Sequence, residues 1–271
     1  MVVRCRLLPM VAGVLIALLS AGSAGAGPYE QNARAGQQAL ARGDLRAAER
    51  AFRAAADADP NRSLPRKYLA DIAFRQQRLQ DAVAEARKSL AIEPNDGDTH
   101  YNLGMYLLYA ANMQPTEEVV NELKRAVELN GRDAEAASNL GAALFLLKRY
   151  DESVPFLQQA TKITPYWAPY WANLGEALLA AGRAEPAVHA FATAAESSRL
   201  GLLKGEAYRA TFGDIYLNWG KAELKRGLTA NAQSYLKRVV ESLTGHAPST
   251  AKVEEAKALL AEVERRLKEE Q

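Results

Sequence analysis

The chain contains little cysteine, little histidine and few aromatic residues. Its 271 residues include one cysteine and three histidines, and only 7% are aromatic. A single cysteine excludes an intrachain disulfide framework and a zinc site built from cysteine clusters. The shortage of aromatic residues disfavours sheets, whereas the abundance of alanine favours helices. The remainder, 48% hydrophobic and 24% charged, is an ordinary globular composition rather than that of a disordered chain.

Residues 1–26 have the pattern of a secretory signal peptide. A short basic start precedes an apolar stretch over 7–19, and small residues follow. Ala24-Gly25-Ala26 fits the small-x-small pattern that signal peptidase reads. An uncleaved anchor is the alternative, but a spanning helix needs about 20 apolar residues, more than this stretch provides. We therefore expect a periplasmic or secreted protein, cleaved near Ala26.

Cleavage would change the charge and the cysteine content. It removes Arg4, Arg6 and Cys5 but no acidic residue, so the formal net charge falls from +2 to zero. A neutral chain has no general attraction for nucleic acid, and a chain without cysteine tolerates an oxidising compartment. A lipoprotein is disfavoured because its processing needs a cysteine just after the apolar stretch. We expect no nucleic-acid partner and no stable membrane span after cleavage.

An internal repeat organises the rest of the chain. A small residue recurs with spacings of 34, 34, 37, 34 and 45 residues, at Gly36, Ala70, Gly104, Gly141, Gly175 and Gly220. A second small residue follows 12 places later in most copies, and proline follows 24 places later in three of them. The third copy fits this register if three residues are inserted after Leu108, within the loop-like stretch 112–115. Such periodicity indicates a repeat architecture.

Each copy has the pattern of two antiparallel helices. In the fourth copy, apolar residues recur three and four places apart over 137–147 and again over 154–163. We expect Asp151 to cap the second helix, because its carboxylate can accept bonds from unpaired amide hydrogens. Pro165 ends that helix, since proline disfavours helical geometry at the residue before it. The recurring small residue lets the two helices approach closely.

This pattern resembles the tetratricopeptide repeat family. The best-matching copy carries Trp171, Leu174-Gly175, Leu178, Ala187, Phe191 and Ala194. The tripeptide Asn-Leu-Gly also occurs three times, at 102–104, 139–141 and 173–175. The resemblance implies an all-α, right-handed superhelical solenoid of antiparallel helix pairs. The expected divisions are five repeats over 27–199, a divergent sixth with an extended first helix over 200–245, and a C-terminal capping helix over 246–271.

The last helix admits two interpretations. Apolar residues three and four places apart over 253–267 predict the helix itself. Solenoids need a terminal cap for solubility, and this helix could serve as one. It could instead form a coiled-coil seam between two copies of the chain. The pattern spans about two heptads, fewer than the roughly three to four that a coiled coil requires. We favour the cap and keep a homo-oligomer as the alternative.

The sequence contains no catalytic or metal-binding constellation that we recognise. His100, His189 and His246 are far apart and lack the i, i+4 pairing of a helical metal site. There is no Gly-x-Ser-x-Gly elbow and no phosphate-binding loop. We therefore expect no catalytic residue, no metal, no cofactor and no enzyme activity. An enzyme with an unrecognised pair of carboxylates is a remote alternative.

The resemblance implies a binding groove. In similar arrays the first helix of each copy lines a concave groove that binds extended peptides or partner helices. The corresponding positions here, which we call the groove face, include Lys67, Asp71, Phe74, Tyr101, Met105, Tyr109, Phe145, Glu176 and Lys221. Apolar and aromatic side chains at the middle with charges around them are the usual anatomy of a binding patch. The alternative is that Tyr101 and Phe145 only pack against a neighbouring repeat.

The groove face predicts the chemistry of the partner. The family's basic clamp for a terminal carboxylate is not evident, because the middle copies lack lysine and arginine at these positions. We therefore expect an apolar or mixed partner segment. A second aromatic concentration lies at 166–171, where we expect Trp171 to be buried and Trp167 or Tyr170 to be a candidate exposed anchor. The prediction is a non-catalytic protein-binding scaffold of the bacterial envelope.

Overall fold

The structure, a computed structural model, describes residues 27–198 and 205–269. Within these ranges it contains thirteen α-helices, one short 3-10 helix and no strand. The α-helices are α1 (Pro28–Ala41), α2 (Leu45–Ala58), α3 (Ser63–Arg75), α4 (Leu79–Ile92), α5 (Gly97–Ala110), α6 (Glu117–Leu129), α7 (Ala134–Leu146), α8 (Tyr150–Ile163), α9 (Ala168–Ala180), α10 (Ala184–Ser198), α11 (Gly205–Lys225), α12 (Thr229–Leu243) and α13 (Thr250–Glu269). The predicted all-α fold class is confirmed. The expected signal peptide lies outside the described residues.

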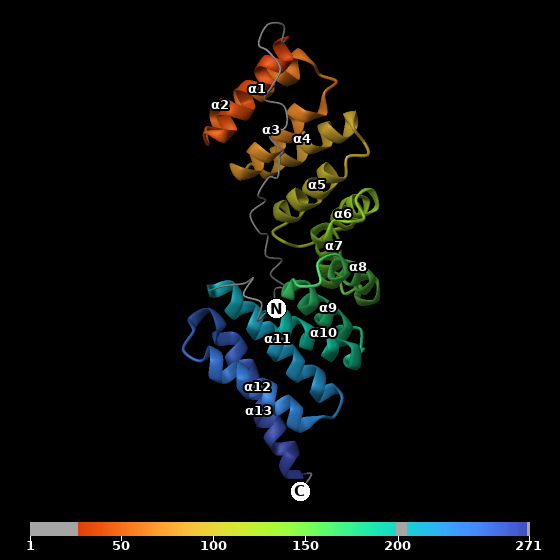
Figure 1. Cartoon of the computed structure of the whole chain (residues 1–271), viewed down its shortest axis with the longest axis vertical. Helices are drawn as coiled ribbons and strands as arrows, with labels where there is room; N and C mark the ends of the chain where they lie inside the picture. Colours follow the sequence, from red (N-terminus) through yellow and green to blue (C-terminus); the bar gives the residue numbers. More distant parts are fainter. Residues whose placement is uncertain (1–26, 199–204, 270–271) are drawn as a thin grey trace. The chain divides into compact units, whose positions relative to one another are not determined.

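Consecutive helices form antiparallel hairpins, as the repeat pattern predicted. Each odd-numbered helix from α1 to α11 packs against the helix that follows it (Figure 1). The chain divides into two compact units, which we call unit 1 (residues 1–131) and unit 2 (residues 132–271). Unit 1 holds α1–α6 and unit 2 holds α7–α13.

The recurring small residue marks the closest approach within a hairpin. A Cβ atom placed on Gly175 would lie 2.5 Å from the ring of Phe191, and one on Gly141 would lie 2.6 Å from Leu157. Both separations are shorter than real Cβ contacts allow. Glycine therefore lets a large side chain of the second helix lie directly on the backbone of the first. Phe191 and Leu157 are buried at these crossings.

The turns inside the hairpins use left-handed backbone geometry. Gly182 has φ +79°, and in the lengthened third hairpin Asn112 and Met113 have φ +51° and +64°. The prediction that Asp151 caps α8 is wrong. The turn closes at Lys148, with φ +63°, and α8 begins at Tyr150 without a side-chain cap. Asp151 therefore lies in the first helical turn, where it forms an ion pair with Arg183 at 2.5 Å.

Helix α13 closes the core of unit 2. Its Val253, Ala256 and Val263 are buried in the same apolar cluster as Leu236 of α12. Burying such side chains is the main favourable term in folding, at roughly 25 cal/mol for each Å² of apolar surface. Among the helices that the structure describes, none has the length and apolar character needed to cross a membrane.

Candidate functional site

The groove-face residues of unit 1 come from α3 and α5. Lys67, Asp71 and Phe74 lie on α3, and Tyr101, Met105 and Tyr109 lie on α5. Tyr101 and Met105 are buried, with 8% and 1% of their surface exposed, whereas the other four are half-buried. The accessible part of this face is therefore formed by Lys67, Asp71, Phe74 and Tyr109.

Phe74 joins α3 to α5 through two ring contacts. Its ring lies 4.9 Å from that of Tyr106 and 5.1 Å from that of Tyr109, the second in an edge-on arrangement. Edge-on and tilted aromatic pairs are favourable beyond the area they bury. Burial raises the pKa of Tyr106 well above its ordinary value, and nearby Asp71 adds to this effect. Tyr106 is thus neutral and buried, and its ring packs against that of half-exposed Phe74.

Lys67 forms the charged part of this face. Its Nζ lies 2.8 Å from Asp96 and 3.1 Å from Glu93. Burial lowers the pKa of Lys67, but the bonds to these carboxylates outweigh it, so the pKa is raised. Burial likewise opposes ionisation of Asp96, but Lys67 and Thr99 lower its pKa overall. The cluster stays charged at neutral pH and ties the start of α3 to the α4–α5 turn.

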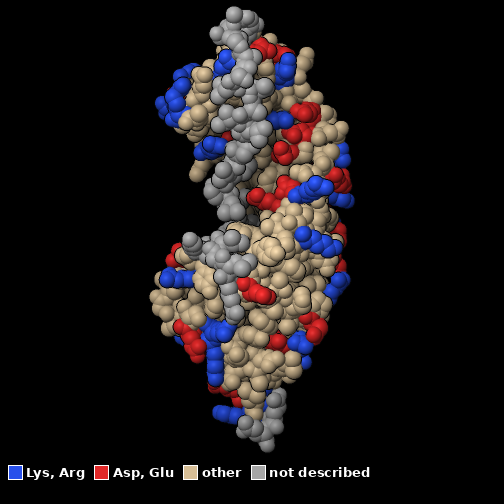
Figure 2. Space-filling view, viewed as in Figure 1, with Lys and Arg blue, Asp and Glu red and all other residues tan. Residues whose placement is uncertain are grey.

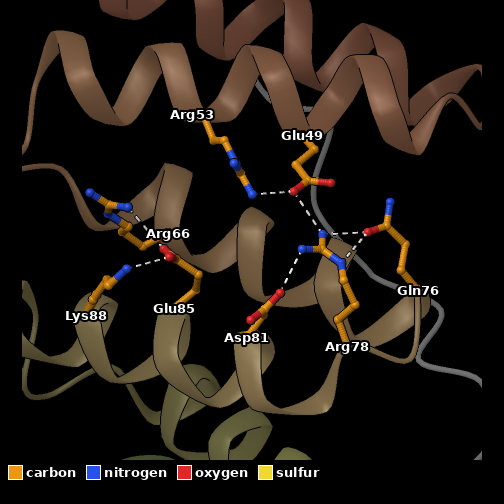
Figure 3. Close-up of polar contacts among 8 residues, drawn as sticks. All are labelled: Glu49, Arg53, Arg66, Gln76, Arg78, Asp81, Glu85 and Lys88. Atoms are coloured by element: carbon orange, nitrogen blue, oxygen red, sulfur yellow. Dashed lines mark hydrogen bonds and ion pairs between the residues drawn. The ribbon is translucent and has the colours of Figure 1, made fainter.

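A second polar network lies at the junction of the first two hairpins (Figure 3). Arg78 contacts Glu49 of α2 at 2.9 Å and Asp81 of α4 at 2.8 Å, and its Nε donates to Gln76 at 2.9 Å. In the same view Arg66 of α3 meets Glu85 of α4 at 3.1 Å. These groups are largely partnered with one another. The network therefore fixes one hairpin against the next rather than offering free charges to a ligand.

Basic side chains gather over the first helix pair of unit 1 (Figure 2). Arg42, Arg46 and Arg50 are exposed there. These three make no ion pair within the described part of the chain, although a surface arginine is usually well suited to bind carboxylates or phosphates. This concentration was not singled out from the sequence.

In unit 2 the groove-face residues are Phe145 on α7, Glu176 on α9 and Lys221 on α11. All three are half-buried. The ring of Phe145 lies 5.3 Å from that of Tyr150 in its own hairpin. Lys221 forms an ion pair with Glu255 of α13 at 2.6 Å. Helix α13 therefore contributes a carboxylate to this face, which the sequence did not predict.

Among the carboxylates of the groove face, that of Glu176 has the pKa farthest from its ordinary value. Burial raises its pKa to about 7, and the negative charge of Asp214 acts in the same direction. Lys221, Lys252 and a hydrogen bond from Asn218 oppose this shift but do not cancel it. Lys252 is itself engaged by Asp214 at 2.5 Å. Near neutral pH, Glu176 is consequently divided between its protonated and ionised forms.

Asparagines form a row of contacts that sequence reasoning missed. The side-chain amide of Asn218 donates to Glu176 at 2.8 Å, and that of Asn173 donates to Ser138 at 3.4 Å. Tyr68 and Gln37 make the equivalent contact in unit 1, at 3.5 Å. These bonds link the first helices of adjacent repeats. The available signal was the recurrence of asparagine two places before the small residue in the last four copies.

The aromatic segment differs from expectation. Trp171, predicted to be buried, is half-buried, because its ring edges a hollow between α8 and α10. Its Nε1 donates to the carbonyl oxygen of Pro165 at 2.7 Å. Trp167 and Tyr170 are half-buried as well, with ring centroids 6.5 Å apart. Tyr166 is the exposed member, with 67% of its surface accessible.

Two of the histidines, His100 and His246, are held in separate local contacts. His100 lies 2.6 Å from Glu122 and 2.9 Å from the carbonyl oxygen of Pro94. His246 lies 2.9 Å from Glu206. Among residues 27–198 and 205–269, no group of three or more histidine, cysteine or acidic side chains is arranged to hold a metal ion. The polar groups described above fix helices to one another and leave mixed, half-exposed faces.

Comparison with known proteins identifies the repeat. The tetratricopeptide repeat family model matches residues 34–97 and 120–166. No protein with a curated description matches the chain.

Several solved structures share the fold. PilW, described as a widely conserved type IV pilus biogenesis factor, is 18% identical with a TM-score of 0.58, covering 85% of this chain and 98% of its own. YrrB, described as a TPR protein with an unusual peptide-binding site, is 18% identical with a TM-score of 0.64, covering 76% and 97%. MamA from Desulfovibrio magneticus is 21% identical with a TM-score of 0.58, covering 66% and 99%. At these identities the similarity establishes the solenoid fold.

Proposed function

Because the chain belongs to the tetratricopeptide repeat family, we propose that it is a non-catalytic scaffold that binds a protein segment on its groove face. The observation that carries the proposal is the half-exposed pair Phe74 and Tyr109, whose rings lie 5.1 Å apart on adjacent first helices. Lys67 and Asp71 lie on the same face of α3. Aromatic anchors inside a charged rim are typical of a protein-binding surface.

The partner segment is apolar or mixed rather than an acidic tail. In unit 1, Lys67 is engaged by two carboxylates and Asp71 is paired with Arg75 at 2.9 Å. An acidic segment would have to compete with these carboxylates for the lysine. The rings of Phe74 and Tyr109 keep part of their surface exposed. Apolar contact with these rings is therefore the main source of affinity that this face offers.

A paired pull-down tests the groove face. The chain would be used as bait with a cell-envelope extract, alongside a Phe74→Ala plus Tyr109→Ala variant. Phe156→Ala on α8 is the control, because it also removes a half-buried ring, from a second helix. We expect partners to be lost from the double variant alone. Unchanged partners, with helical dichroism intact in every variant, would refute the assignment.

We further infer that the scaffold acts in the bacterial envelope, as a periplasmic or secreted component of an envelope complex. The pattern of residues 1–26 supports export. The structural likeness to PilW, a type IV pilus biogenesis factor, is consistent with that location. N-terminal sequencing of the protein isolated from its own host tests export. A mature chain beginning at Gly27 is expected, and an intact Met1 in the cytoplasm would contradict it.

Self-assembly is the second candidate function. The exposed side of α13 carries alternating charges, with Lys257 and Glu254 in contact at 2.9 Å and Arg265 and Glu269 at 2.7 Å. Its apolar side is already buried in unit 2. The helix is therefore better suited to capping than to pairing with a second copy. Light scattering of the mature chain with and without residues 247–271 distinguishes capping from pairing. If the chain oligomerises through this helix, the deletion converts the oligomer to a monomer; if the helix is a cap, the oligomeric state does not change.

A further inference from the structure

One pair of positions recurs in every hairpin. The first position lies four places before the recurring small residue, and the second lies 15 places after it, or 18 in the lengthened third copy. From the first copy to the sixth these positions hold Asn32 and Ala51, Arg66 and Glu85, His100 and Glu122, Ala137 and Phe156, Trp171 and Ala190, and Tyr216 and Tyr235.

Several of these pairs fill the space between the two helices. The second copy places Arg66 3.1 Å from Glu85 (Figure 3), and the third places His100 2.6 Å from Glu122. In the sixth copy the pair is aromatic, with Tyr216 and Tyr235 6.3 Å apart. Trp219 then stacks on Tyr235 at 4.0 Å. Charge pairing and ring stacking are thus two ways of occupying the same place in the repeat.

The fifth copy leaves the place open. There the large Trp171 is opposed by the small Ala190, and Leu174 stands where the sixth copy has Trp219. The structure has a hollow of about 340 Å³ at this place. Its floor is apolar, formed by Trp171, Leu174 and Leu178 of α9 with Ala190 of α10. We call this hollow the Trp171 pocket.

The rim of the Trp171 pocket is basic and polar. Among the residues that the structure describes, Lys162, Gln158 and His189 line it, and no acidic residue does. Lys162 is exposed and makes no ion pair with any residue in the described ranges. The indole Nε1 of Trp171 is already bonded to Pro165, so the ring meets a ligand as an apolar wall. An apolar wall beside an unpaired ammonium group matches a ligand that carries an apolar group next to a negative charge.

We propose that the Trp171 pocket binds a protein segment in which a leucine or aromatic side chain adjoins a carboxylate. The apolar side chain packs on Trp171, Leu174 and Leu178, and the carboxylate pairs with Lys162. The volume lies at the low end of the range of about 300–1,000 Å³ for ligand sites, which suits one side chain rather than a cofactor. Trp171 and Glu176 are five residues apart, about 140° around α9, so this site is separate from the groove face.

A blocked peptide tests the proposal. The probe is acetyl-Ser-Gly-Leu-Asp-Gly-Ser-amide, with one matched peptide in which Leu becomes Ala and another in which Asp becomes Asn. Titration into the ¹⁵N-labelled mature chain, followed through the indole signal of Trp171, reports occupancy of the pocket. Phe substitutions of the other two tryptophans assign that signal. We expect the Leu-Asp peptide to bind and both matched peptides to bind at least about fivefold more weakly, since each lost contact is worth about 1 kcal/mol.

The chain supplies its own blocking variant and its own control. Ala190→Phe fills the pocket with a ring that the fourth copy already carries at this position, in Phe156. Ala51→Phe makes the same change at the equivalent position of the first copy. We expect Ala190→Phe to weaken binding at least tenfold and Ala51→Phe to leave it unchanged, with both variants as helical as the parent. Lys162→Gln should remove the preference for Asp over Asn.

Three results would overturn the proposal. One is the absence of any indole shift at millimolar Leu-Asp peptide. Another is binding that survives Ala190→Phe. The third is equal affinity for the Asp and Asn peptides. None of these results concerns Phe74 or Tyr109, so the groove-face assignment is tested separately, by its own pull-down.

Discussion

The side-chain amide of Asn218 donates a hydrogen bond to the carboxyl group of Glu176 at 2.8 Å, joining α11 to α9 across two repeats. Asn218 is almost completely buried, with 3% of its surface exposed. A buried carboxyl group is costly to ionise unless its partners compensate fully. Here they do not, and its pKa remains at about 7. This contact makes the stability of unit 2 sensitive to pH.

Glu176→Gln tests that sensitivity. An ordinary glutamate has a pKa of 4.5, so between about pH 4.5 and 7 the unfolded chain loses a proton that the folded chain retains. Stability contributed by this group therefore falls as the pH rises through that window. We expect Gln to raise the free energy of unfolding by roughly 1–3 kcal/mol at about pH 8 and to change it little at about pH 4. Urea melts at both pH values measure this, and an equal effect at both would contradict it.

Gly175→Ala tests the close approach inside the fifth hairpin. The new Cβ would lie 2.5 Å from the ring of Phe191, so the helices must separate. Alanine gains about 1 kcal/mol in helix propensity, but we expect a net loss of about 1–3 kcal/mol through overpacking. Gly104→Ala is the matched control, because its nearest atom lies farther away, 3.0 Å, on the flexible Leu123. A larger loss at Gly104 than at Gly175 would overturn this explanation.

Lys67 and Asp96 should be energetically coupled at neutral pH. The pKa of Asp96 is lowered in the folded chain, so its contribution is present above its ordinary value of 3.8 and is lost as the pH falls through the folded value. A double-mutant cycle with Lys67→Met and Asp96→Asn should give about 0.5–1.5 kcal/mol of coupling near pH 7. The same cycle near pH 3 should give much less. Coupling that does not depend on pH would exclude the ion pair as its source.

Trp171→Phe removes one hydrogen bond and keeps most of the ring. The indole Nε1 bonds to the carbonyl oxygen of Pro165, closing the turn between α8 and α9 at 2.7 Å. Because the carbonyl is partly accessible to water, we expect a loss of about 0.5–1.5 kcal/mol in thermal or chemical unfolding. Trp167→Phe is the control, and we expect it to change stability less. Equal losses would mean that ring size, not this bond, matters.

The fold could be predicted because its physical causes are local and repeated. Glycine at 141 and 175 recurs with a large residue 16 places later, and that spacing alone predicts a hairpin crossing. The cap predicted at Asp151 is wrong, because α8 begins earlier, at Tyr150. Whether a turn ends at Lys148 or two residues later depends on a single left-handed residue, which composition does not reveal.

The candidate site was less predictable. Positions on a helix face follow from spacing, so Phe74 and Tyr109 could be proposed from the sequence, but their accessibility depends on neighbours from other helices. Met105 was assigned to the same face and is buried. The opposition of Trp171 to Ala190 depends on comparing the same position across repeats, a signal that was present in the sequence but not used.

The groove face is proposed to receive a protein partner. Photocrosslinking in living cells tests it most directly, with a photoreactive residue placed singly at Asp71 or Lys221 on that face, or at Lys124 or Glu264 on exposed surfaces elsewhere. We predict protein adducts from the first two positions, and their loss when Phe74→Ala and Tyr109→Ala are added to the Asp71 variant. Adducts arising equally from all four positions, or only from Lys124 and Glu264, would contradict partner binding at the groove face.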